Sequence, residues 1–169
     1  MTRRIVLSVA LVATISAVLA GHPADHGGHA ASPPPGDELA GMIDPRVTQG
    51  NIQQTICKPT WTRWVQPPRD AMEAIKRNLA MDIHVNTRDY ELDHIVPLDL
   101  GGAPLDLRNL MLQPRTGACN AHDKEVLERR LWIMVCAGDL TLNGAQHEIA
   151  IDWRAGYKKW INAKGCGTQ

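Results

Sequence analysis

The stretch that decides the fold covers residues 90–136 and reads YELDHIVPLDLGGAPLDLRNLMLQPRTGACNAHDKEVLERRLWIMVC. Gly101, Gly102 and Pro104 interrupt it, because glycine and proline punctuate regular structure. Apolar residues recur at helical spacing in its last third, and Gly138 follows as a helix-ending residue. We therefore expect a strand over 90–96, a loop over 97–108, a second short strand over 109–113 and a helix over about 120–136.

Three further segments flank this unit. Residues 60–65 alternate polar and apolar side chains up to Pro67, which predicts a short strand or extended segment. Residues 69–81 place their apolar side chains on one face of an amphipathic helix, and residues 143–161 do the same. Together these elements predict an α+β fold.

The charge balance of the chain argues against one mode of function. Its 169 residues include 18 Lys+Arg and 18 Asp+Glu, whereas proteins that bind nucleic acid through a broad positive field usually carry a basic excess. Residues 1–20 have the basic start, apolar run and small-residue end of a signal peptide, which predicts a secreted or periplasmic protein. Its removal would take away Arg3 and Arg4, leaving 16 basic against 18 acidic side chains, a net charge of −2.

Four cysteines stand at Cys57, Cys119, Cys136 and Cys166, widely spaced and without a C-x-x-C pair. In an exported protein, an even number of such cysteines predicts two disulfides. Four cysteines allow three connectivities, and the sequence does not choose among them. We favour Cys57 with Cys136 and Cys119 with Cys166.

The chain divides into three predicted parts. These are a signal peptide over 1–20, a disordered leader rich in His, Pro and Gly over 21–45, and a folded domain over 46–169. His22, His26 and His29 of the leader could converge on one metal ion. A solvated linker is the simpler explanation, because nothing preorganises these ligands.

The central unit resembles a known family. The run Glu91-Leu92-Asp93-His94-Ile95-Val96-Pro97-Leu98, followed by Gly101-Gly102 and Arg108-Asn109-Leu110, closely resembles the core of the HNH endonucleases, the ββα-metal nucleases. Residues 55–57, 135–138 and 153–160 look like parts of small exported bacterial proteins that carry this core. The resemblance covers about residues 90–130 for the core. It implies a ββα-metal (HNH) core with flanking helices, stabilised by disulfides.

The resemblance also implies roles for single residues. The first histidine of the family core is the general base and matches His94, and a neutral-range pKa lets an imidazole both accept and release a proton. Asp93 matches the acidic residue that helps to hold one divalent metal. Asn109 matches the middle asparagine, whose amide holds the intervening loop and orients the base. A hard carboxylate ligand favours Mg²⁺, with Mn²⁺ or Zn²⁺ as alternatives.

The third position of the motif departs from the commonest family pattern. The usual spacing from the middle asparagine leads to Ala118, which offers no ligand, and an insertion around residues 114–117 moves the candidates to Asn120 or His122. We favour His122 as the metal ligand, because imidazole is a usual ligand at this position. Arg115 and Lys124 are the candidates for contacts with neighbouring substrate phosphates.

Three functional hypotheses are consistent with these residues. The leading hypothesis is an exported, monomeric, metal-dependent endonuclease that hydrolyses phosphodiester bonds of DNA, with no membrane span after processing. One bound cation would let such an enzyme meet a phosphate without a broad basic surface. The second hypothesis is a non-catalytic exported binding or envelope-associated module that retains the HNH scaffold. The third, a metal scavenger that uses the histidines of the leader, ranks last.

Overall fold

The computed structural model describes residues 41–167. The predicted signal peptide and residues 21–40 of the predicted leader lie outside the described residues. Within the part described, none of the helices combines the length and the apolar character that a membrane span needs.

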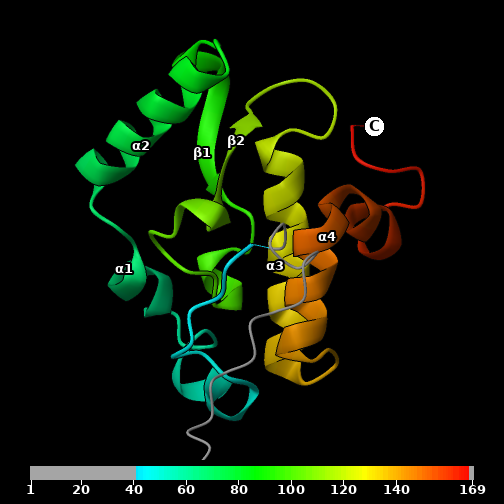
Figure 1. The fold of residues 1–169 in the computed structure, drawn as a ribbon. Coiled ribbons are helices and arrows are strands. Elements are labelled where there is room, and N and C mark those ends of the chain that lie inside the picture. The colour runs from blue at the N-terminus through cyan, green and yellow to red at the C-terminus, as the bar shows by residue number, and fades with distance from the viewer. Residues whose placement is uncertain (1–40, 168–169) are drawn as a thin grey trace, which may run out of the picture. The chain divides into compact units, whose positions relative to one another are not determined.

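The described chain is an α+β protein in which a small sheet lies between helices (Figure 1). Helix α2 packs against the two strands, and α3 and α4 pack against each other. The helices are α1 (Trp61–Val65), α2 (Arg69–Asp82), α3 (Ala121–Ala137) and α4 (Leu142–Trp160), and the strands are β1 (Tyr90–His94) and β2 (Leu110–Pro114). Short 3-10 turns, η2 (Gln49–Gln54), η3 (Thr87–Asp89), η4 (Leu98–Leu100) and η5 (Leu107–Asn109), join them.

The sheet consists of β1 and β2 in antiparallel register. Tyr90 lies opposite Pro114, and His94 lies opposite Leu110. Both strands therefore end within the central unit, and the residues that follow β1 meet those that precede β2. The Ile95 N–H donates to the Asn109 carbonyl at 2.8 Å, which continues the pairing one step beyond the sheet.

Helix α3 begins and ends with local signals that the sequence carries. The Asn120 side chain accepts hydrogen bonds from the backbone N–H groups of His122 and Asp123, which is an N-cap. Gly138 ends the helix with φ of 86°, in the left-handed region where glycine has no steric penalty. The predicted helix and its C-terminal glycine are confirmed.

The core lies mainly between α3 and α4. Leu127, Leu131 and Val135 of α3 are fully buried, and they belong to one cluster with Ile149 and Trp153 of α4. Burying an aliphatic side chain of this size contributes about 1.5–3 kcal/mol. This packing fixes α3, the helix whose first turns face the sheet.

Two disulfides tie the helices to the rest of the chain. Cys57 pairs with Cys136, which links the segment before α1 to the end of α3. Cys119 pairs with Cys166, which links the start of α3 to the segment after α4. Both favoured pairings are confirmed, and they fit a compartment more oxidising than the cytosol.

Two expectations about local structure are wrong. Residues 61–65 form helix α1 instead of a strand, and the Trp64 and Gln66 N–H groups donate to the carbonyls of Thr60 and Thr62. Within the described residues the sheet holds only β1 and β2, and α1 packs against η4 instead. The spacing of Trp61, Trp64 and Val65 suits a helix equally well.

The expected leader also extends too far. Ile43 forms an antiparallel bridge with Gly102, and the Asp44 N–H donates to the Gly101 carbonyl at 2.8 Å. Asp44 is buried and holds Arg46 through paired hydrogen bonds. Residues 43 and 44 of the predicted leader therefore belong to the folded domain, although the Gly- and Pro-rich composition of this region predicts disorder.

Candidate active site

His94 ends strand β1 and is held by the loop that follows it. Its Nε2 lies 3.0 Å from the carbonyl oxygen of Pro104. Because a carbonyl oxygen only accepts, Nε2 carries the hydrogen in the neutral ring, and Nδ1 keeps its lone pair. Burial lowers the pKa of His94, although the Pro104 hydrogen bond and the Asp93 carboxylate act against this shift. A neutral imidazole with a free Nδ1 can accept a proton at neutral pH.

Asn109 is fully buried and joins the two ends of the loop over 97–108. Its Oδ1 accepts from the Val96 N–H at 2.9 Å, and its Nδ2 donates to the carbonyls of Val96 and Ala103, each at 3.0 Å. Gly102 lies so close that an added Cβ would stand 1.8 Å from the Val96 oxygen. Asn109 is thus a structural anchor for the segment that carries Pro104, the partner of His94.

Lys124 does not lie where a phosphate ligand would. Its side chain is completely buried, and its Nζ lies 3.0 Å from Asp93 Oδ2 and 2.7 Å from the His94 carbonyl, with Glu128 as a third partner. The expectation that Lys124 contacts substrate is therefore wrong. Burial lowers the pKa of Lys124, but the carboxylates of Glu128 and Asp93 together raise it above its ordinary value, so the side chain stays charged.

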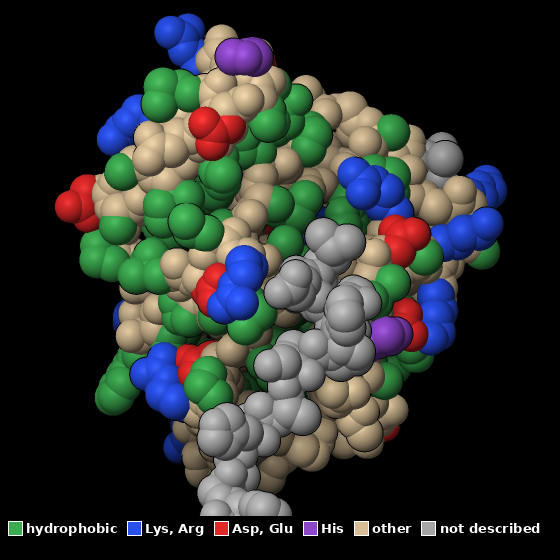
Figure 2. All heavy atoms as spheres, in the orientation of Figure 1, with side chains coloured by type: hydrophobic (Ala, Val, Ile, Leu, Met, Phe, Trp, Pro, Cys, Tyr) green, Lys and Arg blue, Asp and Glu red, His purple; other side chains and the backbone are tan. Residues whose placement is uncertain are grey.

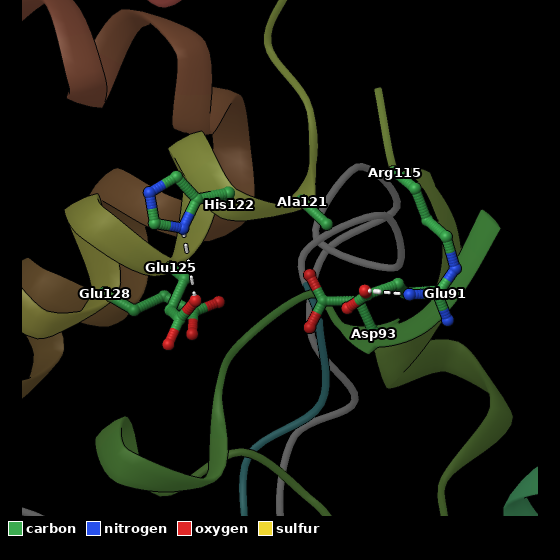
Figure 3. A pocket seen from close by; sticks show the side chains of 7 residues that line it. All are labelled: Glu91, Asp93, Arg115, Ala121, His122, Glu125 and Glu128. Atoms are coloured by element: carbon green, nitrogen blue, oxygen red, sulfur yellow. Dashed lines mark hydrogen bonds and ion pairs between the residues drawn. The ribbon is translucent and has the colours of Figure 1, made fainter. Parts of the chain in front are cut away.

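A pocket of about 320 Å³ opens between β1, the end of β2 and the start of α3. It is lined by Glu91, Asp93, Arg115, Ala121, His122, Glu125 and Glu128. Figure 3 shows the Asp93 carboxylate pointing from β1 toward α3, with Glu125 and Glu128 facing it. Asp93, His122 and Arg115 of the predicted residues thus line one pocket, and Figure 3 shows the His122 ring turned toward Glu125. His94 is not among the residues that line this pocket.

The two candidates for the third position differ in their availability. Asn120 Oδ1 already accepts two backbone hydrogen bonds as the cap of α3, and its Nδ2 donates to the Gly117 carbonyl. Asn120 also lines a different pocket from Asp93. The His122 ring is 79% exposed, lies in the Asp93 pocket and has only a 3.5 Å contact with Glu125. His122 is therefore the more accessible of the two side chains.

Few side chains that could bind a metal lie close to one another in the described residues. Within residues 41–167, no group of three or more His, Cys, Asp or Glu side chains lies close enough together to hold an ion. Asp93 and His122 are the two predicted ligands that share a pocket. Mg²⁺ commonly binds through one or two carboxylates, several waters and substrate phosphates, and Asp93 could supply one such carboxylate. The imidazole of His122 is a ligand more typical of Zn²⁺.

The sequence interpretation missed Glu128, which lies one helical turn after Lys124 and forms an ion pair with it. Burial, together with the negative charge of Asp93, raises the pKa of Glu128 to about 7, although the Lys124 ammonium opposes this. The i, i+4 spacing of a lysine and a glutamate in a predicted helix was the available signal. It indicates an ion pair but does not reveal that the pair is buried.

Arg115 stands at the rim of the pocket, paired with Glu91. The two side chains are 45% and 46% exposed. Figure 2 shows Lys and Arg side chains scattered over one face of the molecule, several of them beside Asp or Glu. Arg115 is a half-exposed cation that lines the pocket.

No protein-family model, curated protein or solved structure matches the chain. The resemblance to HNH endonucleases rests on residues 91–98, 101–102 and 108–110 of the sequence alone.

Proposed function

We propose that the protein is an exported metal-dependent endonuclease that hydrolyses phosphodiester bonds of DNA, with His94 as general base. The observation that carries the proposal is the pairing of two features at the end of β1. Asp93 shares a pocket with His122, and the next residue is a histidine whose Nδ1 is left free by its Pro104 hydrogen bond.

Each residue has a defined task in this proposal. His94 Nδ1 takes a proton from the attacking water, and Pro104 keeps the ring in the required tautomer. Asn109 holds the loop that supplies Pro104. Asp93 and His122 would hold the divalent cation, which supplies charge stabilisation at the scissile phosphate when bound. Arg115 contacts a neighbouring phosphate from the rim, where it is accessible to a ligand.

A plasmid-nicking assay tests this function. Purified protein should convert supercoiled plasmid to the nicked form with Mg²⁺ or Mn²⁺ and should lose this activity in EDTA. His94→Ala should slow the reaction by roughly 100-fold or more, the usual contribution of a general base. The matched control is His147→Ala, since His147 is exposed on α4. Equal rates for His94→Ala and the unaltered protein would refute the proposal.

A second candidate function is a non-catalytic exported module that binds a partner through the same scaffold. Two observations favour it. Lys124 already neutralises Asp93, and four of the seven residues that line the pocket are acidic, which repels a polyanion in the absence of metal. This candidate predicts a folded protein that shows neither nicking nor heat of binding when Mg²⁺ or Mn²⁺ is titrated into it.

A further inference from the structure

The buried end of Lys124 is surrounded by oxygen atoms. Asp93 Oδ2, the His94 carbonyl and Glu128 Oε1 each accept from its ammonium group, which has three hydrogens to donate. Two carboxylates and a carbonyl are also the oxygen donors that hard cations prefer. The chain itself thus supplies a cation at this point.

The ammonium group of Lys124 lies between two carboxylates. Its Nζ is 3.0 Å from Asp93 Oδ2, and Glu128 Oε1 pairs with it as well. The ammonium reaches Asp93 from the protein interior, while the Asp93 side chain remains 24% exposed and lines the pocket. A divalent cation that binds Asp93 from the pocket would share this carboxylate with Lys124.

We propose that Lys124 is a built-in cation that weakens divalent-metal binding at Asp93, so that the metal binds well only when a substrate phosphate is present. This inference rests on the proposed role of Asp93 as a metal ligand. Like charges on either side of one carboxylate repel each other, and burial increases that repulsion by lowering the effective dielectric constant. A phosphate adds the negative charge that the half-neutralised carboxylate no longer supplies.

The position of Glu128 limits this repulsion without removing it. Glu128 pairs with the same ammonium and is 18% exposed at the pocket wall. The ammonium group of Lys124 therefore neutralises Asp93 only in part, because it also pairs with Glu128. Lys124 acts through Asp93 in this scheme and does not contact substrate, so it is a positioning residue whose effect appears in metal affinity.

The unaltered protein gives the first test. Mn²⁺ is titrated in the absence and presence of a short phosphorothioate DNA oligonucleotide that resists cleavage, and free Mn²⁺ is read by electron paramagnetic resonance. We expect weak binding of Mn²⁺ alone and at least roughly tenfold tighter binding with the oligonucleotide. Equal affinity under the two conditions, or tight binding without the oligonucleotide, would overturn the proposal.

Two uncharged variants give the second test. Lys124→Met and Lys124→Gln should each bind Mn²⁺ alone roughly tenfold or more tightly than the unaltered protein. Lys158→Met removes the same charge from an exposed position of α4 and should leave Mn²⁺ affinity unchanged. A folded Lys124 variant with unchanged or weaker affinity contradicts the inference, since a purely structural lysine would give that result.

The two proposals fail in different assays. Mn²⁺ affinity is read without any cleavage, so an inactive protein whose affinity rises in Lys124→Met refutes only the nuclease. An active nuclease whose Mn²⁺ affinity ignores Lys124 refutes only the inference about Lys124. Circular dichroism shows which variants are folded, and if neither variant folds, the oligonucleotide experiment on the unaltered protein decides.

Discussion

Two anchors hold the end of β1, and they differ in chemistry. The Asn109 anchor is neutral and joins Val96 to Ala103 through three hydrogen bonds within the loop. The Lys124 anchor is ionic and joins Asp93 and the His94 carbonyl to helix α3. The first fixes a local loop, and the second fixes the contact between sheet and helix.

The difference between the anchors shows which of them should respond to pH and to salt. A buried amide whose donors and acceptors are satisfied contributes the same stability at any moderate pH or salt concentration. A buried ammonium between two carboxylates responds to proton uptake and to competing cations. The pocket is lined by Asp93 and Glu128 of the ionic anchor, so its charge depends on pH and on competing cations. The hydrogen bonds of Asn109 to the loop do not depend on either.

The largest expected effect comes from breaking the ionic anchor. Lys124→Met leaves Asp93 and Glu128 facing each other without a cation, and removal of one partner of a buried ion pair costs about 3–5 kcal/mol. Urea denaturation at pH 7 in EDTA measures the loss in the free energy of unfolding. Lys158→Met serves as the control. A loss below about 1 kcal/mol, typical of an exposed ion pair, would show that the anchor is not buried in solution.

Breaking the neutral anchor should cost somewhat less. Asn109→Ala leaves the Val96 N–H and two carbonyls without partners, and we expect a loss of about 2–3 kcal/mol. The loss should be the same in low and high salt, because no charge is involved. Asn143→Ala, at an exposed position of α4, should change stability by less than about 0.5 kcal/mol. A strong salt dependence of the Asn109→Ala loss would erase the distinction between the anchors.

The pH dependence of stability should come from the ionic side. The pKa of Glu128 in the folded protein, about 7, lies above its ordinary value of 4.5. Its contribution therefore favours the folded state below pH 4.5 and is lost as the pH rises through about 7. In EDTA, Glu128→Gln should gain stability relative to the unaltered protein between pH 5 and 8.

Asn109→Ala serves as the comparison for that profile. Its free energy of unfolding should run parallel to that of the unaltered protein over the same pH range. The lowered pKa of His94 acts in the opposite direction, favouring the folded state above its ordinary pKa of 6.5, but it is common to Glu128→Gln and the unaltered protein. A constant difference between Glu128→Gln and the unaltered protein across the range would contradict the assignment.

The smallest effect is expected at the rim. Arg115 and Glu91 are about half exposed, so Arg115→Gln should change stability by less than about 1 kcal/mol. Loss of one phosphate contact should reduce the salt dependence of oligonucleotide binding by about one unit of slope. Fluorescence anisotropy at several salt concentrations measures this slope. Arg77→Gln, at an exposed position of α2, should leave this slope unchanged, and an equal change in both variants would remove Arg115 from the binding surface.

The sequence predicts the local features well because their signals lie close together along the chain. The apolar spacing of α3, the helix end at Gly138 and the two strands need only their own residues and neighbours. Residues 60–65 are one exception, because a six-residue pattern fits a strand and a helix equally well and contacts with distant segments decide between them.

The candidate site is harder to predict because its contacts join distant elements. Lysine is almost never fully buried unless paired, so composition and spacing place Lys124 on the surface. Its burial follows from the approach of the start of α3 to the end of β1, where carboxylates from both elements meet it. The sequence likewise makes Asn120 a candidate ligand, and in the structure its side-chain oxygen caps the start of α3.

A crystal structure grown with Mn²⁺ and a short phosphorothioate oligonucleotide tests the central idea most directly. Anomalous scattering locates the manganese without any assumption about its ligands. We predict one peak in the pocket, within coordination distance of both Asp93 and His122, with Lys124 still paired to Asp93. A peak that lies away from Asp93, or its absence at saturating Mn²⁺, would contradict the proposed site.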